Sequence, residues 1–154
     1  FWCASFPHKA HTILWRLYHH KLPCKEFLHR IMPAQFVDPS CVYCGDLDTE
    51  EHFVWACPVR KEIWQTIANR FFTDPSMLTF AHIACPTPSG PSVIPLLSLN
   101  SLDIIACTIL SIWQFHWKLI FGNRPFWPQE VAANATRLIR KLHKENSARN
   151  QSNA

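Results

Sequence analysis

Four residues in one short span have the types and the spacing of metal ligands. Two residues separate Cys41 from Cys44, seven separate Cys44 from His52, and four separate His52 from Cys57. Thiolate and imidazole are donors that Zn2+ prefers, and a closed set of four is typical of structural sites. The pattern therefore predicts a Cys3His knuckle with zinc as a structural cofactor. The alternative is three ordinary buried cysteines beside a surface histidine, and the paired spacing favours the metal site over it.

The residues around the ligands favour the same local geometry. Gly45 can adopt the positive φ that a turn after paired cysteines often needs. Thr49 is predicted to cap a short helix that presents His52. Pro58 steers Cys57 out of the α region and begins the next helix. A nearby carboxylate is expected to orient the second ring nitrogen of the histidine, and the candidates are Asp46, Asp48 and Glu51.

The elements that must position this loop are helical. Apolar residues at helical spacing predict helices over 9–20, 25–32, 58–72, 101–121 and about 128–144. The helix over 101–121 is apolar on nearly all sides, which predicts a central and mostly buried position. No convincing strand pairs are present, so the fold class is mainly α. Inward-facing residues of the second and third helices are expected to be Phe27, Leu28, Ile31, Val59, Ile63, Trp64 and Ile67.

The chain of 154 residues is long enough to bury a sizeable core. Residues 1–73 are predicted to form a small helical zinc-binding domain. Residues 74–98 are rich in proline and are predicted to be a linker or an irregular covering segment. Residues 99–145 are predicted to form a two-helix C-terminal region, followed by a polar, frayed tail over 146–154.

Composition also limits the setting in which this chain works. Its seven cysteines are an odd number, and no signal-peptide pattern follows Phe1. Reduced thiols and an intracellular location, in the nucleus or the cytoplasm, are therefore expected. The longest apolar stretch, 104–113, is too short to span a bilayer, so no membrane partner is expected. Most histidines outside the cluster are expected to be solvated. The isolated cysteines are expected to be small apolar core residues: Cys3, Cys24, Cys85 and Cys107.

Three features of the sequence resemble the zinc-binding region of reverse transcriptases from non-LTR retrotransposons. The first is the helix and Leu-Pro break over 14–23. The second is the cysteine pair at 41–44 followed by the acidic-Thr-x-x-His ending over 48–52. The third is the Cys-Pro pair at 57–58 with the later Trp64. The resemblance extends from Leu14 to about Ile67, about a third of the chain.

The resemblance implies a segment that lies C-terminal to the polymerase of a retroelement protein. The parent reverse transcriptase polypeptide is then an expected partner. The chain itself has no Tyr/Phe-x-Asp-Asp box and no adjacent pair of aspartates. It also lacks a cluster of carboxylates suited to two-metal phosphoryl chemistry. The fragment is therefore expected not to be an enzyme.

Two functions fit these observations. The net charge of +4 is unevenly spread, because residues 1–40 and 129–154 are basic and 41–72 are acidic. A module that binds RNA or DNA would meet phosphates with the basic ends and could stack bases on an exposed aromatic side chain such as Trp55. A structural or protein-interaction module that braces the polymerase is favoured by the acidic loop. The expected nucleic-acid contacts are Arg16, Lys21, Tyr43, Arg137, Arg140, Lys141 and Lys144.

Overall fold

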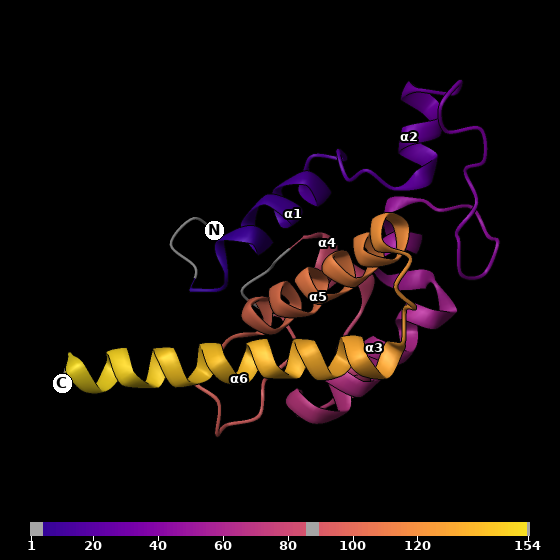
Figure 1. Ribbon diagram of the computed structural model, residues 1–154. Coiled ribbons are helices and arrows are strands. Elements are labelled where there is room, and N and C mark those ends of the chain that lie inside the picture. Colours follow the sequence, from indigo (N-terminus) through magenta and orange to yellow (C-terminus); the bar gives the residue numbers. More distant parts are fainter. Residues whose placement is uncertain (1–4, 86–89, 154) are drawn as a thin grey trace.

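The structure, a computed structural model, describes residues 5–85 and 90–153, and this part of the chain is mainly helical (Figure 1). Within it, β-structure is limited to two isolated bridges, Ser40 with Leu47 and Phe72 with Val93. The mainly α fold class is therefore confirmed. The elements in chain order are α1 (His8–Tyr18), α2 (Lys25–Ile31), η1 (His52–Ala56), α3 (Pro58–Phe71), η2 (Pro75–Met77), α4 (Phe80–Ala84), α5 (Ser101–Gly122) and α6 (Pro128–Ser152).

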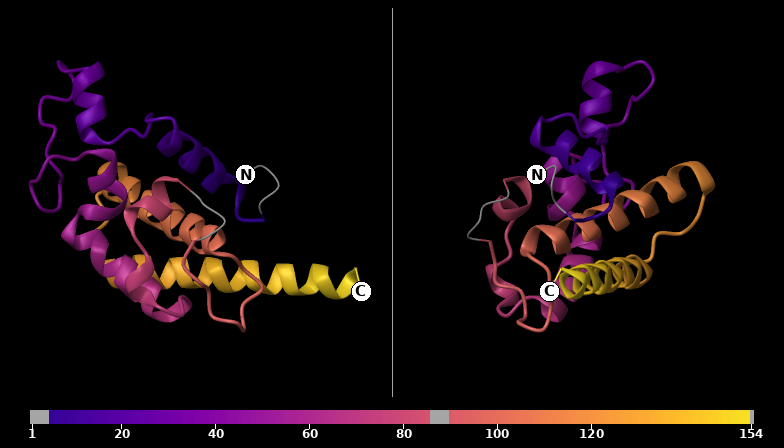
Figure 2. Two further views of the ribbon diagram at one scale, coloured as in Figure 1. Left: turned by 180° about the vertical axis from the view of Figure 1, so that it is seen from behind. Right: turned by 90° about the vertical axis from the view of Figure 1, so that its left-hand side faces the viewer.

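Helix α5 is the centre of the molecule and packs against α1, α3 and α6 (Figures 1 and 2). A reciprocal capping box begins it: the Asp103 amide donates to Asn100 Oδ1 at 2.9 Å, and the Asn100 amide donates to Asp103 Oδ2 at 3.0 Å. The following residues from Ile104 to Ile112 are all buried. The helix ends at Asn123, which adopts the left-handed conformation with φ of 49°.

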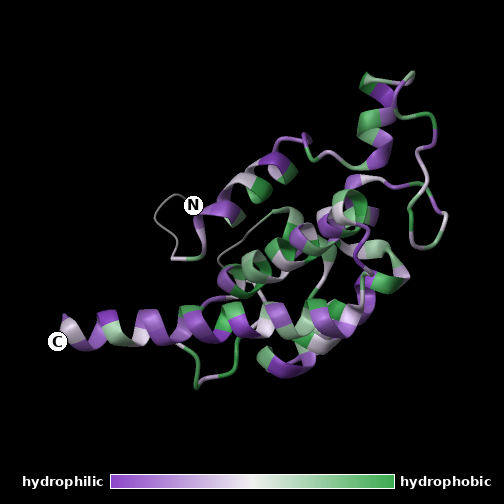
Figure 3. Ribbon diagram, viewed as in Figure 1, coloured by the Kyte–Doolittle hydropathy of each residue, from purple (hydrophilic) through white to green (hydrophobic). Residues whose placement is uncertain are grey.

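The length and hydropathy of α5 would by themselves allow it to cross a bilayer. Its most apolar window has a mean hydropathy of 1.4, but 56% of that window is buried inside the structure. The middle of the helix also has a polar contact with α6, since the Asn134 side chain donates to Ser111 Oγ at 3.0 Å. These contacts are those of the core helix of a helical domain, and the hydropathy colours show how strongly apolar that core is (Figure 3).

Helix α6 is longer than the sequence predicted. It continues past Lys144 to Ser152, so the expectation of a frayed tail from 146 was wrong for residues 146–152. No glycine or proline interrupts this stretch. The Asn146 side chain also anchors it by donating to Ser5 Oγ at 3.1 Å and to the Ser98 carbonyl at 3.3 Å. The last turns project beyond the other helices (Figures 1 and 2).

Helix α2 is less buried than predicted. None of its side chains is fully buried, and Ile31, expected to face inward, is 52% exposed. The reason is its position, because α2 stands away from the helices around α5 (Figure 2). In α3, by contrast, Ile63, Trp64 and Ile67 are buried as expected, whereas Val59 is only partly buried.

The proline-rich segment between α3 and α5 covers part of the core. The Ile94 amide donates to the Phe71 carbonyl at 3.0 Å, and the Thr73 amide donates to the Ser92 carbonyl at 2.9 Å. Leu78 is buried within this segment. The described residues 74–85 and 90–98 therefore pack on the core, and they include the short helices η2 and α4, which the prediction did not contain.

The central position of α5 can be tested with two isoleucines of that helix. Ile109 is 1% exposed and Ile120 is 41% exposed. We expect Ile109→Ala to lower the free energy of unfolding by about 2–5 kcal/mol, because it removes buried surface and leaves a cavity. Ile120→Ala is the matched control, with an expected effect within about 0.5 kcal/mol. Denaturant unfolding measures both, and equal losses would contradict the burial of the first half of α5.

Candidate metal centre

The structure brings the four predicted ligands together. One ligand atom from each of Cys41, Cys44, His52 and Cys57 lies within 4.8 Å of all the others. The sulfurs of Cys41 and Cys57 are 3.9 Å apart, and Cys44 Sγ lies 3.2 Å from His52 Nε2. A tetrahedral zinc ion with Zn–S bonds of about 2.3 Å would separate two sulfurs by about 3.8 Å. The donor set and its spacing therefore fit a bound metal ion, with Nε2 as the histidine ligand atom.

Backbone hydrogen bonds shape the first half of the loop as a knuckle. The Gly45 amide donates to the Cys41 carbonyl at 3.0 Å, and the Tyr43 amide lies 3.5 Å from Cys41 Sγ. Gly45 has φ of +83°, which confirms the expected left-handed turn. The Cys41 amide closes the loop by donating to the Asp46 carbonyl at 2.7 Å. The two cysteines of the pair consequently face one point.

A short π-helical segment, η1, presents the second half of the ligand set. Thr49 Oγ1 accepts from the His52 amide at 3.1 Å, as the capping prediction required. Cys57 leaves the helical region with ψ of 127°, and Pro58 begins α3. The expectation for the carboxylates was wrong, because within the described residues Asp46, Asp48 and Glu51 make no hydrogen bond to the His52 ring. The Cys44 thiol instead donates to Asp46 Oδ2 at 3.6 Å.

The sulfurs of Cys41 and Cys57 are hydrogen-bonded to each other across 3.9 Å. This hydrogen bond lowers the pKa of the Cys41 thiol and raises the pKa of Cys57. Both sulfurs are buried, and neither forms a disulfide. A metal ion bound here would take the place of the proton in that hydrogen bond, because thiolate is the ligand form of cysteine.

Two acidic residues of the loop, Asp48 and Glu50, contact the segment between α1 and α2. Asp48 is 2% exposed, and its Oδ2 accepts from the Lys25 amide at 3.0 Å, where α2 begins. Glu50 accepts from the Leu22 amide at 3.0 Å and from His20 Nδ1 at 2.9 Å. The carboxylates of the loop therefore bind the connection between α1 and α2 by hydrogen bonds.

Arg60 is the functional residue that the sequence analysis missed. Its side chain is fully buried and lies against two rings, with its guanidinium 4.1 Å from the Phe53 centroid and 4.9 Å from the Tyr43 centroid. It pairs with Asp48 Oδ1 at 3.6 Å and donates to Nδ1 of His116 in α5 at 3.2 Å. The guanidinium thus connects the ligand loop to the central helix.

A signal for this burial was present in the sequence. Arg60 stands three, four and seven residues before Ile63, Trp64 and Ile67, so it shares the inward stripe of α3. This position alone does not predict burial, because an arginine is rarely fully buried without partners. The partners come from other elements, and α3 alone gives no sign of them.

His116 is buried and neutral, contrary to the expectation of a solvated histidine. Burial and the neighbouring Arg60 guanidinium lower its pKa to about 3. Tyr43 Oη lies 3.1 Å from the same Nδ1 atom. Burial raises the pKa of Tyr43 to about 12, so its hydroxyl stays protonated. His11 is likewise buried.

Three of the predicted nucleic-acid contacts, Tyr43, Arg16 and Lys21, have different surroundings. Tyr43 packs against Phe126, with ring centroids 4.7 Å apart, and below the Arg60 guanidinium, so it is not an open stacking surface. Arg16 lines a pocket between α1 and α5. The Lys21 ammonium lies 5.6 Å from the centroid of the Trp15 ring.

The remaining four predicted contacts lie together. Arg137, Arg140, Lys141 and Lys144 are exposed on one stripe of α6 and line a groove of about 530 Å3 between α6 and α3. Arg70 of α3, which the sequence analysis did not select, lines the same groove and donates to Thr136 Oγ1 at 3.2 Å. Only the fold could place this residue beside α6.

The isolated cysteines differ in how deeply they are buried. Cys24 and Cys107 are fully buried among apolar residues, as expected. Cys85 is exposed, so its assignment to the core was wrong. Cys3 lies outside the described residues.

Two cysteines provide a matched test of the metal site. We expect Cys57→Ser to lose most of the bound zinc, because it removes one of the four donors. It should also lose a large share of the roughly 10–16 kcal/mol that structural zinc contributes in small zinc-folded domains. Cys85→Ser, at an exposed cysteine outside the cluster, should keep one zinc per chain and the wild-type melting temperature. Elemental analysis and thermal unfolding measure both properties. Full zinc content in Cys57→Ser would contradict the ligand assignment.

The buried His116 predicts a pH dependence of stability. Its pKa of about 3 in the folded chain lies below the value of 6.5 for a free side chain, so the unfolded chain binds more protons. The free energy of unfolding should therefore fall as the pH is lowered from about 6.5, with a slope approaching about 1.4 kcal/mol per pH unit. In excess zinc, His116→Gln should show a shallower slope than the wild type, whereas the exposed His19→Gln should not. Equal slopes in all three proteins would contradict a neutral, buried His116.

Comparison with known proteins gives a match to one family. Residues 1–64 match the family described as zinc-binding in reverse transcriptase. No curated protein matches the chain, and no solved structure does. The matched residues are fewer than half of the chain and include all four candidate ligands. The resemblance inferred from the motif is confirmed over residues 1–64, which are similar to the family of zinc-binding regions in reverse transcriptases.

Proposed function

We propose that this chain is a non-catalytic, zinc-braced module of a retrotransposon reverse transcriptase that binds RNA or DNA in the groove between α3 and α6. Zn2+ held by Cys41, Cys44, His52 and Cys57 would fix the ligand loop and the start of α3. The parent polymerase would supply the chemistry. Such a module would work inside the cell, in the nucleus or the cytoplasm.

The observation that carries this proposal is the convergence of five cations on one groove. Arg70 comes from α3, and the other four come from the exposed stripe of α6 defined above. Glu145 is the single carboxylate of the lining, and its Oε1 lies 3.9 Å from Lys141 Nζ. The lining therefore has a large surplus of positive charge. A phosphate backbone is the ligand whose binding such a surplus favours, through the release of counterions.

The acidic ligand loop does not oppose this function. The acidic residues of the loop, Asp46, Asp48, Glu50 and Glu51, were the reason to expect a purely structural module. The carboxylates of Asp48 and Glu50 are occupied by backbone amides and by Arg60 or His20, and Asp48 is buried. Asp46 and Glu51 are exposed, but none of the four residues lines the groove.

The zinc site and the groove are connected through α3. This helix begins directly after Cys57, so the metal ligand sets where its first turn lies. The same helix carries Arg70 to the side of α6, against which it packs. Zinc would consequently position one wall of the groove without touching the nucleic acid.

A second candidate function, bracing of the polymerase through protein contacts, is favoured by one observation. The end of α5 and the connection to α6 expose large apolar side chains: Phe121 is 81% exposed, Trp127 56% and Ile120 41%. Such a group of apolar side chains is typical of a protein-binding surface. It lies apart from the basic groove lining, so the two functions can be tested separately.

The salt dependence of oligonucleotide binding tests the first candidate. For the zinc-loaded chain and single-stranded RNA or DNA, we expect log affinity to fall linearly with log salt concentration. The double variant Arg140→Gln, Lys141→Gln should make that slope shallower by about 1–2, since about 0.7 counterions are released per single-strand phosphate contact. Lys61→Gln, an exposed cation of α3 outside the groove lining, is the control and should keep the wild-type slope.

The outcome decides between the two candidates. A folded, zinc-loaded chain without measurable binding at low salt would exclude the nucleic-acid function. If that chain instead bound a purified polymerase fragment, and Phe121→Ser weakened the binding, the bracing function would be supported.

A further inference from the structure

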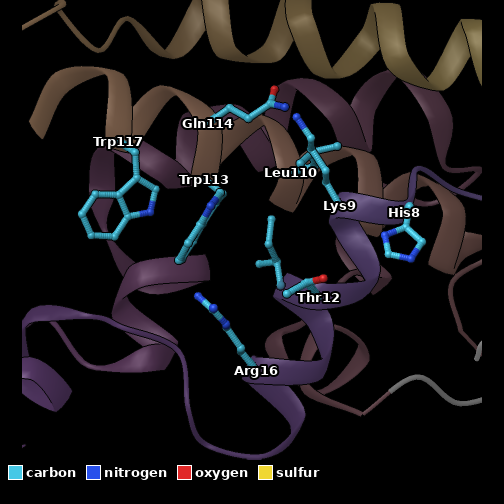
Figure 4. Close-up of a pocket in the computed structure, with 9 residues that line it drawn as sticks. His8, Lys9, Thr12, Arg16, Leu110, Trp113, Gln114 and Trp117 are labelled. Carbon is cyan, nitrogen blue, oxygen red and sulfur yellow. The ribbon is translucent and has the colours of Figure 1, made fainter. Parts of the chain in front are cut away.

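A second cavity lies between α1 and α5, on surfaces that the basic groove does not use (Figure 4). It has a volume of about 460 Å3, within the range of about 300–1,000 Å3 that is typical of small-ligand pockets. Helix α1 contributes Lys9, Thr12 and Arg16, and helix α5 contributes Trp113, Gln114 and Trp117. The pocket therefore combines residues of the zinc-binding half with residues of the C-terminal half.

One wall of this pocket is made of indole rings. Trp113 and Trp117 lie edge to face, with centroids 5.4 Å apart and an interplanar angle of 69°. Trp117 is also stacked on Phe121 at 5.2 Å and 16°, which holds its ring in place. Both indoles are only partly buried, and they stand side by side in Figure 4. The wall is thus a fixed aromatic surface that still meets solvent.

The charge of the pocket has one sign. Lys9 and Arg16 line it, and no carboxylate does. Neither cation forms an ion pair with any residue in the described part of the chain. The Arg16 side chain extends from α1 toward Trp113 (Figure 4), and both residues line the same pocket. The side-chain amide of Gln114 adds both a donor and an acceptor.

We propose that this pocket binds one unpaired nucleotide of a single strand, with the base against the Trp113–Trp117 wall and its phosphate near Arg16 and Lys9. A ligand that is flat and aromatic at one end and anionic at the other matches both features. Stacking on indole is open to every base, so the pocket would select single strands without selecting a sequence. The inference rests on the proposed nucleic-acid function and adds that the module distinguishes unpaired from paired strands.

The test uses the full, zinc-loaded chain with a short oligouridylate and with an RNA duplex of equal length. Trp117→Leu should weaken oligouridylate binding about tenfold and leave duplex binding unchanged, because only an unpaired base can stack. Trp117→Phe keeps an aromatic ring and should lose much less. Arg16→Gln, at a surface position, should weaken binding severalfold without changing the melting temperature, so the test does not depend on the folding of Trp117→Leu.

The matched control is Trp127→Leu, which removes a 56% exposed indole that does not line the pocket and should leave affinity unchanged. Wild-type oligouridylate affinity in both Trp117→Leu and Arg16→Gln would overturn the pocket assignment. If the Arg140→Gln, Lys141→Gln variant bound weakly in that case, the proposed function would still stand. Binding of an acidic peptide to the pocket, together with no change of tryptophan fluorescence on addition of oligouridylate, would also overturn the pocket assignment, in favour of a protein partner. Absence of oligonucleotide binding by the wild type would overturn both proposals.

Discussion

The buried Arg60 guanidinium is the contact on which the arrangement of this molecule depends. A charge without water is costly, and it persists only where partners surround it. Here the partners are Asp48 from the ligand loop, two aromatic faces and neutral His116 from α5. Three of these partners, Asp48, Tyr43 and Phe53, come from the ligand loop, and His116 comes from α5. Arg60 therefore has all of its partners only when the loop, α3 and α5 are in place, which makes their assembly cooperative.

A metal ion held by the four ligands would act on the same short segment as Arg60, from its other side. The metal ligands join the knuckle to the residues just before α3, and Arg60 joins the first turn of α3 to the core. Metal binding energy in small domains is folding energy. The ion would consequently stabilise a loop of modest apolar content. Arg60 connects this loop to the C-terminal helices through His116 of α5. The basic groove lies between α3 and α6, and the tryptophan pocket lies between α1 and α5.

The ligand set, the mainly α fold and the start of α3 at Pro58 could be predicted because each depends on local sequence. Spacing identified the cysteines, and the Thr49 cap and the Gly45 turn followed from backbone preferences. What could not be predicted depends on contacts between distant segments. The burial of Arg60, the role of Arg70 and the helical end of α6 each require a neighbour from another element. Likewise Ile31 has the pattern of a core residue, but α2 stands too far from the core to bury it.

The four ligand side chains differ in how they meet solvent. Cys44 is exposed, whereas Cys41, His52 and Cys57 are buried. A chelator or an oxidant would therefore reach a metal ion in this site from the side of Cys44. Because a coordinated thiolate is protected only while the bond holds, this sulfur is the one on which oxidative damage would start. The resistance of the metal site to oxidation would accordingly depend on one accessible atom, Cys44 Sγ.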